Sequence, residues 1–428
     1  MLDDMASGGD LRHEALLLLP STSSTSYSSL KAAYNPALSI ILAELSSPIK
    51  GTSSKAVLDI AITARGLAAP DSAPRGRSFV HLQQLLASFY RLLGVTSVAQ
   101  AVELDGPGGV DARVFFLDDS ENGSDNNDGG DTNRSQVSRA NLGPIIHLTD
   151  FAASGRSWES IFFLGTREGD MLLNALTTTA KKRGLSNLAP TIRRLPGVSA
   201  LQPQPTVLEP LALHPRRHYS VAVGGTFDHL HAGHKLLLTA TALAIDEVPP
   251  GSKPVQRTIT IGITGDELLV NKQYAEYLES WDERWQGVWG FMESVIHFSP
   301  PLAKQYATPA ATAKIEYVHH PAPNGKYVRV RVSSDLDIKF VQISDPFGPT
   351  ITDEAISALV VSKETRLGGQ AVNDEREKKG WSMLEVFEVD VLDASEGESQ
   401  GENVENFETK ISSTQIRRRQ MNLAKGNL

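Results

Sequence analysis

Apolar residues recur along this chain in two patterns, the three-to-four-residue spacing of an amphipathic helix and the short runs of a buried strand. Helices are predicted over residues 38–45, 81–93, 170–182, 231–244 and 281–298. Strands are predicted over residues 56–64, 114–117, 161–164, 219–223, 258–264, 358–362 and 381–392. Such alternation is typical of parallel sheets covered by helices. We therefore expect an α/β fold, with a Rossmann-like doubly wound parallel sheet in residues 216–428 and a separate, smaller α/β domain in residues 31–185.

Polar and proline-rich segments suggest where these domains begin and end. Residues 1–30 contain a serine- and threonine-rich patch and are expected to be flexible. Residues 118–134 are rich in Asp, Asn, Gly and Ser without the ligand spacing of a calcium loop, so a disordered acidic insertion is expected. Residues 186–215 contain six prolines and are predicted to be a linker. Further insertions are expected near residues 319–340 and 393–408.

The composition argues against several kinds of binding partner and excludes some kinds of site. The 428 residues have a formal net charge of −9, which argues against a nucleic acid bound through the whole surface. There are no cysteines, which excludes disulfides, thiolate metal sites and cysteine nucleophiles. No apolar run approaches the length of a membrane span, and the acidic N-terminus is unlike a secretion signal. We expect a cytoplasmic protein that binds neither nucleic acid nor membrane.

The first candidate site lies in residues 223–235, Val-Gly-Gly-Thr-Phe-Asp-His-Leu-His-Ala-Gly-His-Lys, between a predicted strand and a predicted helix. Gly224 and Gly225 allow a sharp turn and close approach of a phosphate, and the helix start supplies free N–H groups and its positive dipole end. His231 and His234 are three residues apart, so both rings lie on one face of the first turn and can donate to phosphate oxygens. This stretch predicts a nucleotide phosphate site.

Two other interpretations of the histidines are open. A helix-capping role alone leaves the glycines and Thr226 unexplained. A metal pair would need Asp228 or His229 as third ligand, and nothing nearby completes a familiar metal signature. Phosphate binding explains more of these residues, so no protein-bound metal is predicted.

A second candidate site lies far downstream, in Lys-Ile-Ser-Ser-Thr-Gln-Ile-Arg-Arg-Arg at residues 410–419. Ser412, Ser413 and Thr414 stand at a predicted helix start, and Arg417 follows one turn later. Capping would need only one hydroxyl. Three hydroxyls, open N–H groups and an arginine at one helix start predict a second phosphate cradle.

The two stretches together resemble a known family. Gly-Thr-Phe-Asp, His-x-Gly-His and Ile-Ser-Ser-Thr-x-Ile-Arg are similar to signatures of the nucleotidyltransferase superfamily, which activates small molecules with ATP or CTP. Asp-Pro-Phe-Gly-Pro-Thr at residues 345–350, and Ser-Lys-Glu-Thr at 362–365 before a Gly-Gly-x-x-x-Asn-x-x-Arg helix, resemble the eukaryotic type of phosphopantetheine adenylyltransferase. The resemblance covers about residues 216–428.

This resemblance implies a reaction and its partners. The substrates would be ATP and 4′-phosphopantetheine, and the products dephospho-coenzyme A and pyrophosphate. Mg²⁺ would be bound mainly through the ATP phosphates. No P-loop motif is present, so a stand-alone enzyme without a fused dephospho-coenzyme A kinase is expected. The N-terminal domain could then bind other enzymes of coenzyme A biosynthesis.

Residue roles follow from the motifs and the resemblance. The residues expected to act in catalysis are Thr226, His231, His234 and Lys272. Those expected to bind ATP are Gly224, Gly225, Thr226, Phe227, His234, Ser412, Ser413, Thr414 and Arg417. Those expected to bind the acceptor substrate are Thr226, Lys272, Asp345, Asn373 and Arg376. For Lys272 the alternative is an ordinary solvated helix lysine.

Two other functions remain open at this point. One is a nucleotidyltransferase of the same fold that acts on nicotinamide mononucleotide or a phosphorylated alcohol. The other is a non-catalytic scaffold protein, against which the intact set of histidines, Lys272 and downstream hydroxyls argues.

Overall fold

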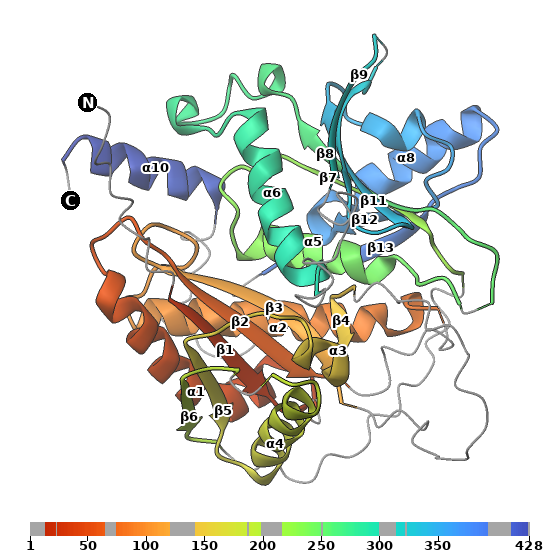
Figure 1. The fold of residues 1–428 in the computed structure, drawn as a ribbon. Helices are drawn as coiled ribbons and strands as arrows, with labels where there is room; N and C mark the ends of the chain where they lie inside the picture. The colour runs from red at the N-terminus through yellow and green to blue at the C-terminus, as the bar shows by residue number, and fades with distance from the viewer. Residues whose placement is uncertain are drawn as a thin grey trace, which may run out of the picture.

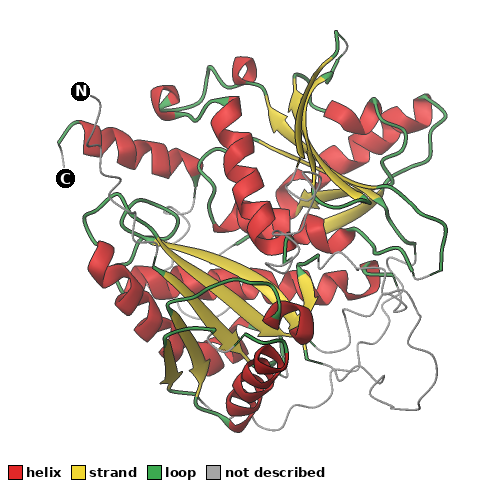
Figure 2. Ribbon diagram, in the orientation of Figure 1, coloured by secondary structure: helices red, strands yellow, loops and turns green. Residues whose placement is uncertain are grey.

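The computed structural model arranges the chain in two β-sheets with helices against each (Figures 1 and 2). The residues described are 13–22, 24–64, 74–119, 142–185, 188–197, 216–249, 251–298, 314–321, 323–392 and 412–426. The predicted α/β class is confirmed. Among the described helices, none has both the length and the apolar character that crossing a membrane requires.

The N-terminal sheet has six strands in the order β4-β3-β2-β1-β5-β6, and all neighbours are parallel. The strands are β1 (Glu14–Leu19), β2 (Ala56–Thr63), β3 (Val110–Asp118), β4 (Ile145–His147), β5 (Ser160–Leu164) and β6 (Thr191–Leu195). One face packs against α1 (Tyr27–Ser46) and α2 (Gly76–Ala99), the other against α3 (Leu148–Ala152) and α4 (Arg167–Lys182). Coverage of both faces explains the continuous apolar runs of these strands.

Two predictions for the N-terminal half are wrong. Residues 14–19 lie in the segment expected to be flexible, yet they form β1, a central strand with five of its six residues buried. Residues 191–195 lie in the predicted linker but form the edge strand β6. An exposed edge strand carries polar residues, which is why Thr-Ile-Arg-Arg-Leu resembles loop sequence. Residues 120–134 of the predicted acidic insertion lie outside the described residues.

The C-terminal sheet has seven strands in the order β13-β12-β7-β8-β11-β10-β9. They are β7 (Ser220–Gly225), β8 (Arg257–Thr264), β9 (Lys314–His319), β10 (Lys326–Arg331), β11 (Leu336–Ile343), β12 (Ala358–Ser362) and β13 (Glu385–Val389). The first five in spatial order are parallel, and β10 and β9 extend the sheet as an antiparallel hairpin. The chain order reverses between β7 and β12, so their carboxyl ends flank the switch point where doubly wound folds bind ligands.

Helices cover both faces of this sheet. One face packs against α5 (Ala232–Ala244) and α6 (Trp281–Ile296), and the other against α8 (Arg366–Lys378). The segment predicted as an insertion near residues 319–340 contains β10 and the beginning of β11, which pairs directly with β8. Lys272, for which a solvated helix position was the alternative, lies outside the regular helices and follows the 3-10 turn Asp266–Leu268. The other predicted insertion, residues 393–408, lies outside the described residues.

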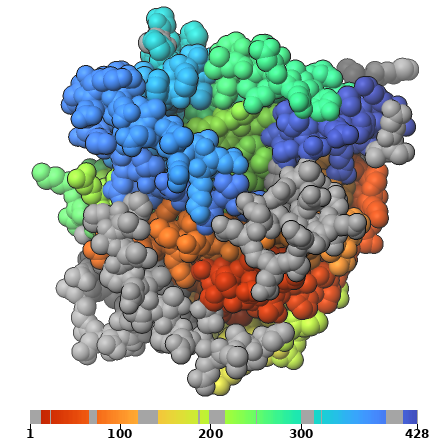
Figure 3. Space-filling view, turned by 180° about the vertical axis from the view of Figure 1, so that it is seen from behind, coloured from red at the N-terminus to blue at the C-terminus, as the bar shows by residue number. Residues whose placement is uncertain are grey.

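The two halves share one apolar core. Helices α2, α5 and α6 lie between the sheets in Figure 1, and residues from both halves belong to a single buried cluster. Phe79 of α2 meets Phe387 of β13 with ring centroids 4.8 Å apart. Seen from behind, the red and orange N-terminal half lies directly against the blue C-terminal half (Figure 3). The first half is therefore packed onto the second by extensive side-chain contact.

One polar contact across this core gives a stability prediction. Gln83 of α2 is 3% exposed; its Oε1 accepts from the Asp390 N–H at 2.9 Å, and its Nε2 donates to Asp390 Oδ2 at 3.2 Å. Gln83→Leu leaves these groups without partners and should lower the free energy of unfolding by about 1–3 kcal/mol. Gln84→Leu, the exposed neighbour, is the matched control in urea unfolding. Equal effects of the two substitutions would contradict the assignment.

Candidate functional site: two helix starts on one loop

Residues 226–230, here called the Asp228 loop, connect β7 to α5. Two of its residues have left-handed backbone, Phe227 at φ 52° and His229 at φ 44°. This conformation is costly for residues other than glycine and persists only where surrounding contacts fix it. The Phe227 ring supplies one such contact because it is fully buried, and a Cβ on Gly225 would come within 3.0 Å of that ring. The predicted glycine turn is thus needed here for packing.

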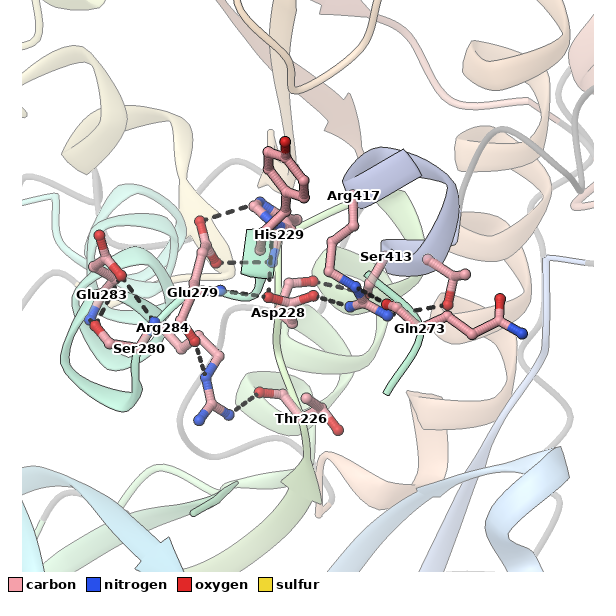
Figure 4. Close-up of polar contacts among 12 residues, drawn as sticks. Thr226, Asp228, His229, Gln273, Glu279, Ser280, Glu283, Arg284, Ser413 and Arg417 are labelled. Atoms are coloured by element: carbon pink, nitrogen blue, oxygen red, sulfur yellow. Dashed lines mark hydrogen bonds and ion pairs between the residues drawn. The ribbon is translucent and has the colours of Figure 1, made fainter. Parts of the chain in front are cut away.

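Asp228 is the centre of the polar network in this loop (Figure 4). Its side chain is fully buried; Oδ1 accepts from the Glu279 N–H at 3.0 Å, and Oδ2 pairs with the Arg417 guanidinium. A buried carboxylate is tolerated only when paired and hydrogen-bonded, and both conditions are met. Asp228 therefore joins the loop, the segment before α6 and the distant helix that carries Arg417.

That distant helix is α10 (Ser413–Ala424), which carries the second predicted phosphate cradle. Ser412 caps it by accepting from the Gln415 N–H, and Ser413 Oγ donates to the Asp228 carbonyl at 2.7 Å. Arg417 is 2% exposed, and its Nε donates to the Gln273 carbonyl at 2.9 Å. The N-terminus of α10 thus lies against the Asp228 loop, only a few residues before α5 begins. Two helix starts, each favourable for an anion, converge on one loop.

Arg284 of α6 is a further organiser of the loop, and no role was predicted for it. It is fully buried and donates to the carbonyls of Thr226 at 2.8 Å and Glu279 at 3.0 Å, and to Asp266 at 2.5 Å. These bonds fix the end of β7 relative to the end of β8. Its one sequence signal is a charged residue on the buried, apolar face of an amphipathic helix.

The two signature histidines lie together at the start of α5. The rings of His231 and His234 stack with centroids 3.9 Å apart at an angle of 25°, as their spacing predicts. His231 stands at the N-cap position but its side chain makes no capping bond. The Nδ1 atoms of both rings are buried and have no hydrogen-bond partner among the described residues. Buried polar atoms without partners are uncommon and fit a site that awaits a ligand.

Burial sets the charge of this pair. It lowers the pKa of His231 well below the usual value, an effect that the neighbouring His234 reinforces, and it lowers the pKa of His234 to about 4. Both imidazoles are neutral at neutral pH in the ligand-free protein. A neutral imidazole still carries one N–H donor, so each can donate to a phosphate oxygen.

His229 in the same loop behaves differently. Its Nε2 lies 2.7 Å from the Tyr277 carbonyl and its Nδ1 lies 3.4 Å from Glu279 Oε1, so both ring nitrogens face acceptors. Burial lowers the pKa of His229, but the bonds to Glu279 and Tyr277 outweigh it and raise the pKa overall. The same pairing lowers the pKa of Glu279 against the opposing effect of burial. His229 and Glu279 form a structural ion pair beside the signature histidines.

These opposite shifts predict how stability changes with pH. The folded-state pKa of His234 is below its unfolded value, so its contribution is present above about pH 6.5 and is lost as pH falls. The loss should be on the order of 1 kcal/mol between about pH 7 and about pH 5.5. The folded-state pKa of His229 is raised, so its contribution is present below about pH 6.5 and is lost as pH rises through the raised value.

The test is urea unfolding of the wild type, His234→Gln and His229→Gln across this pH range. We expect His234→Gln to flatten the acid side of the profile and His229→Gln to flatten the alkaline side. Profiles parallel to wild type in both variants would contradict these charge assignments.

Asp228, His229 and Glu279 are also close enough for their ligand atoms to surround a cation. Both nitrogens of His229 face protein oxygens, and Asp228 is fully buried against Arg417. Mg²⁺ prefers oxygen ligands and retains several waters, which does not fit this closed group. The group fits a hydrogen-bonded network.

The remaining predicted residues fall into two sets. Lys272 is exposed and precedes Gln273, the carbonyl partner of Arg417. Asp345 follows β11 and its Oδ1 accepts from the N–H groups of Phe347 and Gly348, both at 2.8 Å. Both residues therefore follow carboxyl ends of strands in the C-terminal sheet, the edge that binds ligands in doubly wound folds.

Asn373 and Arg376 are buried in α8, at 6% and 1% exposure. The Asn373 amide donates to and accepts from the backbone of Leu384 at 3.0 and 2.8 Å. The Arg376 guanidinium donates to the carbonyls of Thr350, Asp353, Glu354, Ile356 and Ser382. In this conformation all these groups have structural partners, so the geometry does not support the predicted acceptor-binding role of either residue.

Comparison with known proteins gives similarities to both halves. Residues 5–201 match a family described as a domain of unknown function (DUF8446). An uncharacterized protein of Schizosaccharomyces pombe is 36% identical over 208 residues, which are 48% of this chain and 49% of that protein.

Two similar proteins have names that state an activity. Phosphopantetheine adenylyltransferase of Saccharomyces cerevisiae is 33% identical over 202 residues, 47% of this chain and 48% of the relative. Phosphopantetheine adenylyltransferase of Methanothermobacter thermautotrophicus is 30% identical over 204 residues, 47% of this chain and 86% of the relative. The chain thus spans about half the length of the two yeast relatives it matches and most of the archaeal one.

Proposed function

We propose that this chain, which belongs to the phosphopantetheine adenylyltransferase family, is a nucleotidyltransferase that transfers the adenylyl group of ATP to 4′-phosphopantetheine. The products would be dephospho-coenzyme A and pyrophosphate. The observation that carries the proposal is the convergence of the α5 and α10 starts on the Asp228 loop, beside two stacked histidines with partnerless nitrogens. Helix starts and imidazole donors at one place suit a polyphosphate.

The reaction needs no general base. The second pKa of a phosphate monoester is about 6, so the acceptor phosphate is largely dianionic at neutral pH. One of its oxygens attacks the α-phosphorus of ATP, a new P–O bond forms, and the bond to the bridging oxygen breaks with its electron pair leaving on pyrophosphate. Catalysis then consists of alignment and of stabilising charge on the transferred and leaving groups.

Different residues of the site would align the substrates and stabilise the developing charge. Thr226 and Lys272 orient the acceptor phosphate and the α-phosphate. His231 and His234 donate to oxygens on which charge develops in the transition state. Gly224 leaves room for the nucleotide, because a Cβ at this exposed position would point into open space, whereas Gly225 makes room for the Phe227 ring. Asp345 would lie on the acceptor side.

The start of α10 would hold the leaving β- and γ-phosphates through its N–H groups and the hydroxyls of Ser412 and Thr414, whereas the Ser413 hydroxyl already donates to the Asp228 carbonyl. The sequence suggested that Arg417 contacts these phosphates directly. Its pairing with buried Asp228 supports a different role, which is to fix α10 against the loop. Mg²⁺ bound to ATP would neutralise part of the triphosphate charge.

The test is release of pyrophosphate from ATP with Mg²⁺ by the full-length protein. Three acceptors are offered separately: 4′-phosphopantetheine, nicotinamide mononucleotide and glycerol 3-phosphate. We expect release with 4′-phosphopantetheine alone. Release with another acceptor would correct the substrate and keep the reaction class, and release with none would overturn the proposal in favour of a scaffold role.

A further inference from the structure

An unusual loop of the N-terminal half touches the site described above. Residues 103–109, Glu-Leu-Asp-Gly-Pro-Gly-Gly, connect α2 to β3 and are called here the acidic loop. Asp105 has left-handed backbone at φ 67°, and Gly108 follows at φ 72°. A Cβ on Gly109 would come within 2.5 Å of the Glu103 carbonyl, so only glycine fits there. The loop therefore holds Asp105 in a costly backbone conformation that other contacts must maintain.

The contact that Asp105 makes is to the signature helix. Lys235, the residue after His234, is 4% exposed and extends from the first turn of α5 into the N-terminal half. Its ammonium pairs with Asp105, lies 2.5 Å from Asp111 Oδ1, and donates to the Ala112 carbonyl at 3.0 Å. All three partners belong to the N-terminal half.

The two carboxylates also explain why Lys235 can stay charged at this position. A lysine in the first turn of a helix is disfavoured by the helix dipole, and burial disfavours its charge further. The carboxylates of Asp105 and Asp111 more than offset burial and raise the pKa of Lys235, which stays charged. Lys235 is tolerated in the first turn of α5 because the carboxylates of Asp105 and Asp111, in the N-terminal half, neutralise its charge.

The same loop reaches the second phosphate-binding helix. Glu103 pairs with Arg419 of α10, two residues beyond Arg417. In Figure 1, α10 lies over the N-terminal half, consistent with this pair. One short loop thus forms an ion pair with each of the two helices whose starts converge on the Asp228 loop.

We propose that the acidic loop and the adjoining Asp111 of β3 position the nucleotide site. Asp105 and Asp111 fix α5 through Lys235, and Glu103 fixes α10 through Arg419. The inference rests on the proposed function and deepens it. It gives residues of the N-terminal half a task in adenylyl transfer, which is to hold the histidine donors and the leaving-group cradle in register. These acids act through other residues and do not touch substrate.

Asp105→Asn is the central test, because asparagine tolerates left-handed backbone while it removes the charge. Asp111 still pairs with Lys235, so the fold should survive. We expect kcat to fall about tenfold, as misplacement of catalytic groups causes, with KM for ATP within about twofold. The matched control is Asp170→Asn, which removes an exposed ion pair with Arg194 and should leave both constants unchanged.

Glu103→Gln is the second variant and tests the tie to α10. This pair is half-exposed, so loss of folding is not expected. We expect a smaller fall in kcat, about threefold, because an exposed pair holds its helix less firmly. Thermal unfolding of each variant separates positioning from stability: a fall in activity that is matched by a fall in the folded fraction would overturn the proposal.

A readout that does not require activity separates this inference from the proposed function. Hydrogen exchange should speed up several-fold in α5 from the Lys235 N–H onward in Asp105→Asn, and in α10 in Glu103→Gln, while β7 and β8 stay protected. If the wild type transfers no adenylyl group but these changes occur, the proposed function is wrong, while the positioning role of the acidic loop is supported. Exchange identical to wild type in both variants would overturn the positioning role of the acidic loop.

Discussion

His231→Ala should lower turnover about a hundredfold or more while the fold stays intact. The ring of His231 is stacked on His234, its Nδ1 has no partner in the described part of the chain, and its side chain does not cap α5. Removing it therefore breaks no observed hydrogen bond of the folded protein. What is lost is a donor to the oxygens on which charge develops in the transition state.

Steady-state pyrophosphate release is the measurement for this variant. We expect kcat and kcat/KM to fall together, which is the sign of an interaction made in the transition state. His13→Ala is the control, since His13 directly precedes β1 and its ring contacts Glu159 in a partly exposed pair. Wild-type turnover in His231→Ala would remove this residue from the mechanism.

Arg417→Met should both destabilise the protein and abolish activity. Asp228 is fully buried, and its basic partners among the described ion pairs are Arg417 and the neighbouring His229. The substitution removes the first of these. Breaking a buried pair by removing one partner costs about 3–5 kcal/mol because the remaining charge is uncompensated. The start of α10 would also lose its tie to the Asp228 loop, and the cradle for the leaving phosphates with it.

The control for this variant lies next to it in the chain. Arg418 is exposed on the same helix, so Arg418→Met changes the same charge and side-chain volume without touching Asp228. Urea unfolding and pyrophosphate release are measured for both. Equal stability of the two variants would show that the Arg417–Asp228 pair does not hold α10 in place.

The sequence predicted most elements because they are long or strongly patterned. The amphipathic helix at 81–93 and the apolar strand at 258–264 appear as α2 and β8 with extended or nearly unchanged bounds. The prediction failed where the local sequence pattern does not reveal that a segment is buried in the folded protein. Residues 14–19 are short and adjoin a serine-rich segment, yet β1 is buried because strands and helices distant in sequence cover both its faces.

The two predicted motif stretches lie together in the structure, but the contacts between them could not be predicted from the sequence. Asp228 and Arg417 are 189 residues apart in sequence, and nothing local indicates that they pair. Polar residues in a motif also have structural uses, as Arg376 shows by donating to five backbone carbonyls. Lys235 illustrates the same limit, because its partners lie in the other half of the chain.

The most direct test of the central claim follows the α-phosphorus of ATP. The full-length protein is incubated with 4′-phosphopantetheine, Mg²⁺ and ATP labelled at that position, and the products are separated. We expect the label to appear in dephospho-coenzyme A, with unlabelled pyrophosphate in equal amount, and we expect His231→Ala to suppress both. Label that stays in ATP, or is released as AMP without reaching the acceptor, would contradict adenylyl transfer at this site.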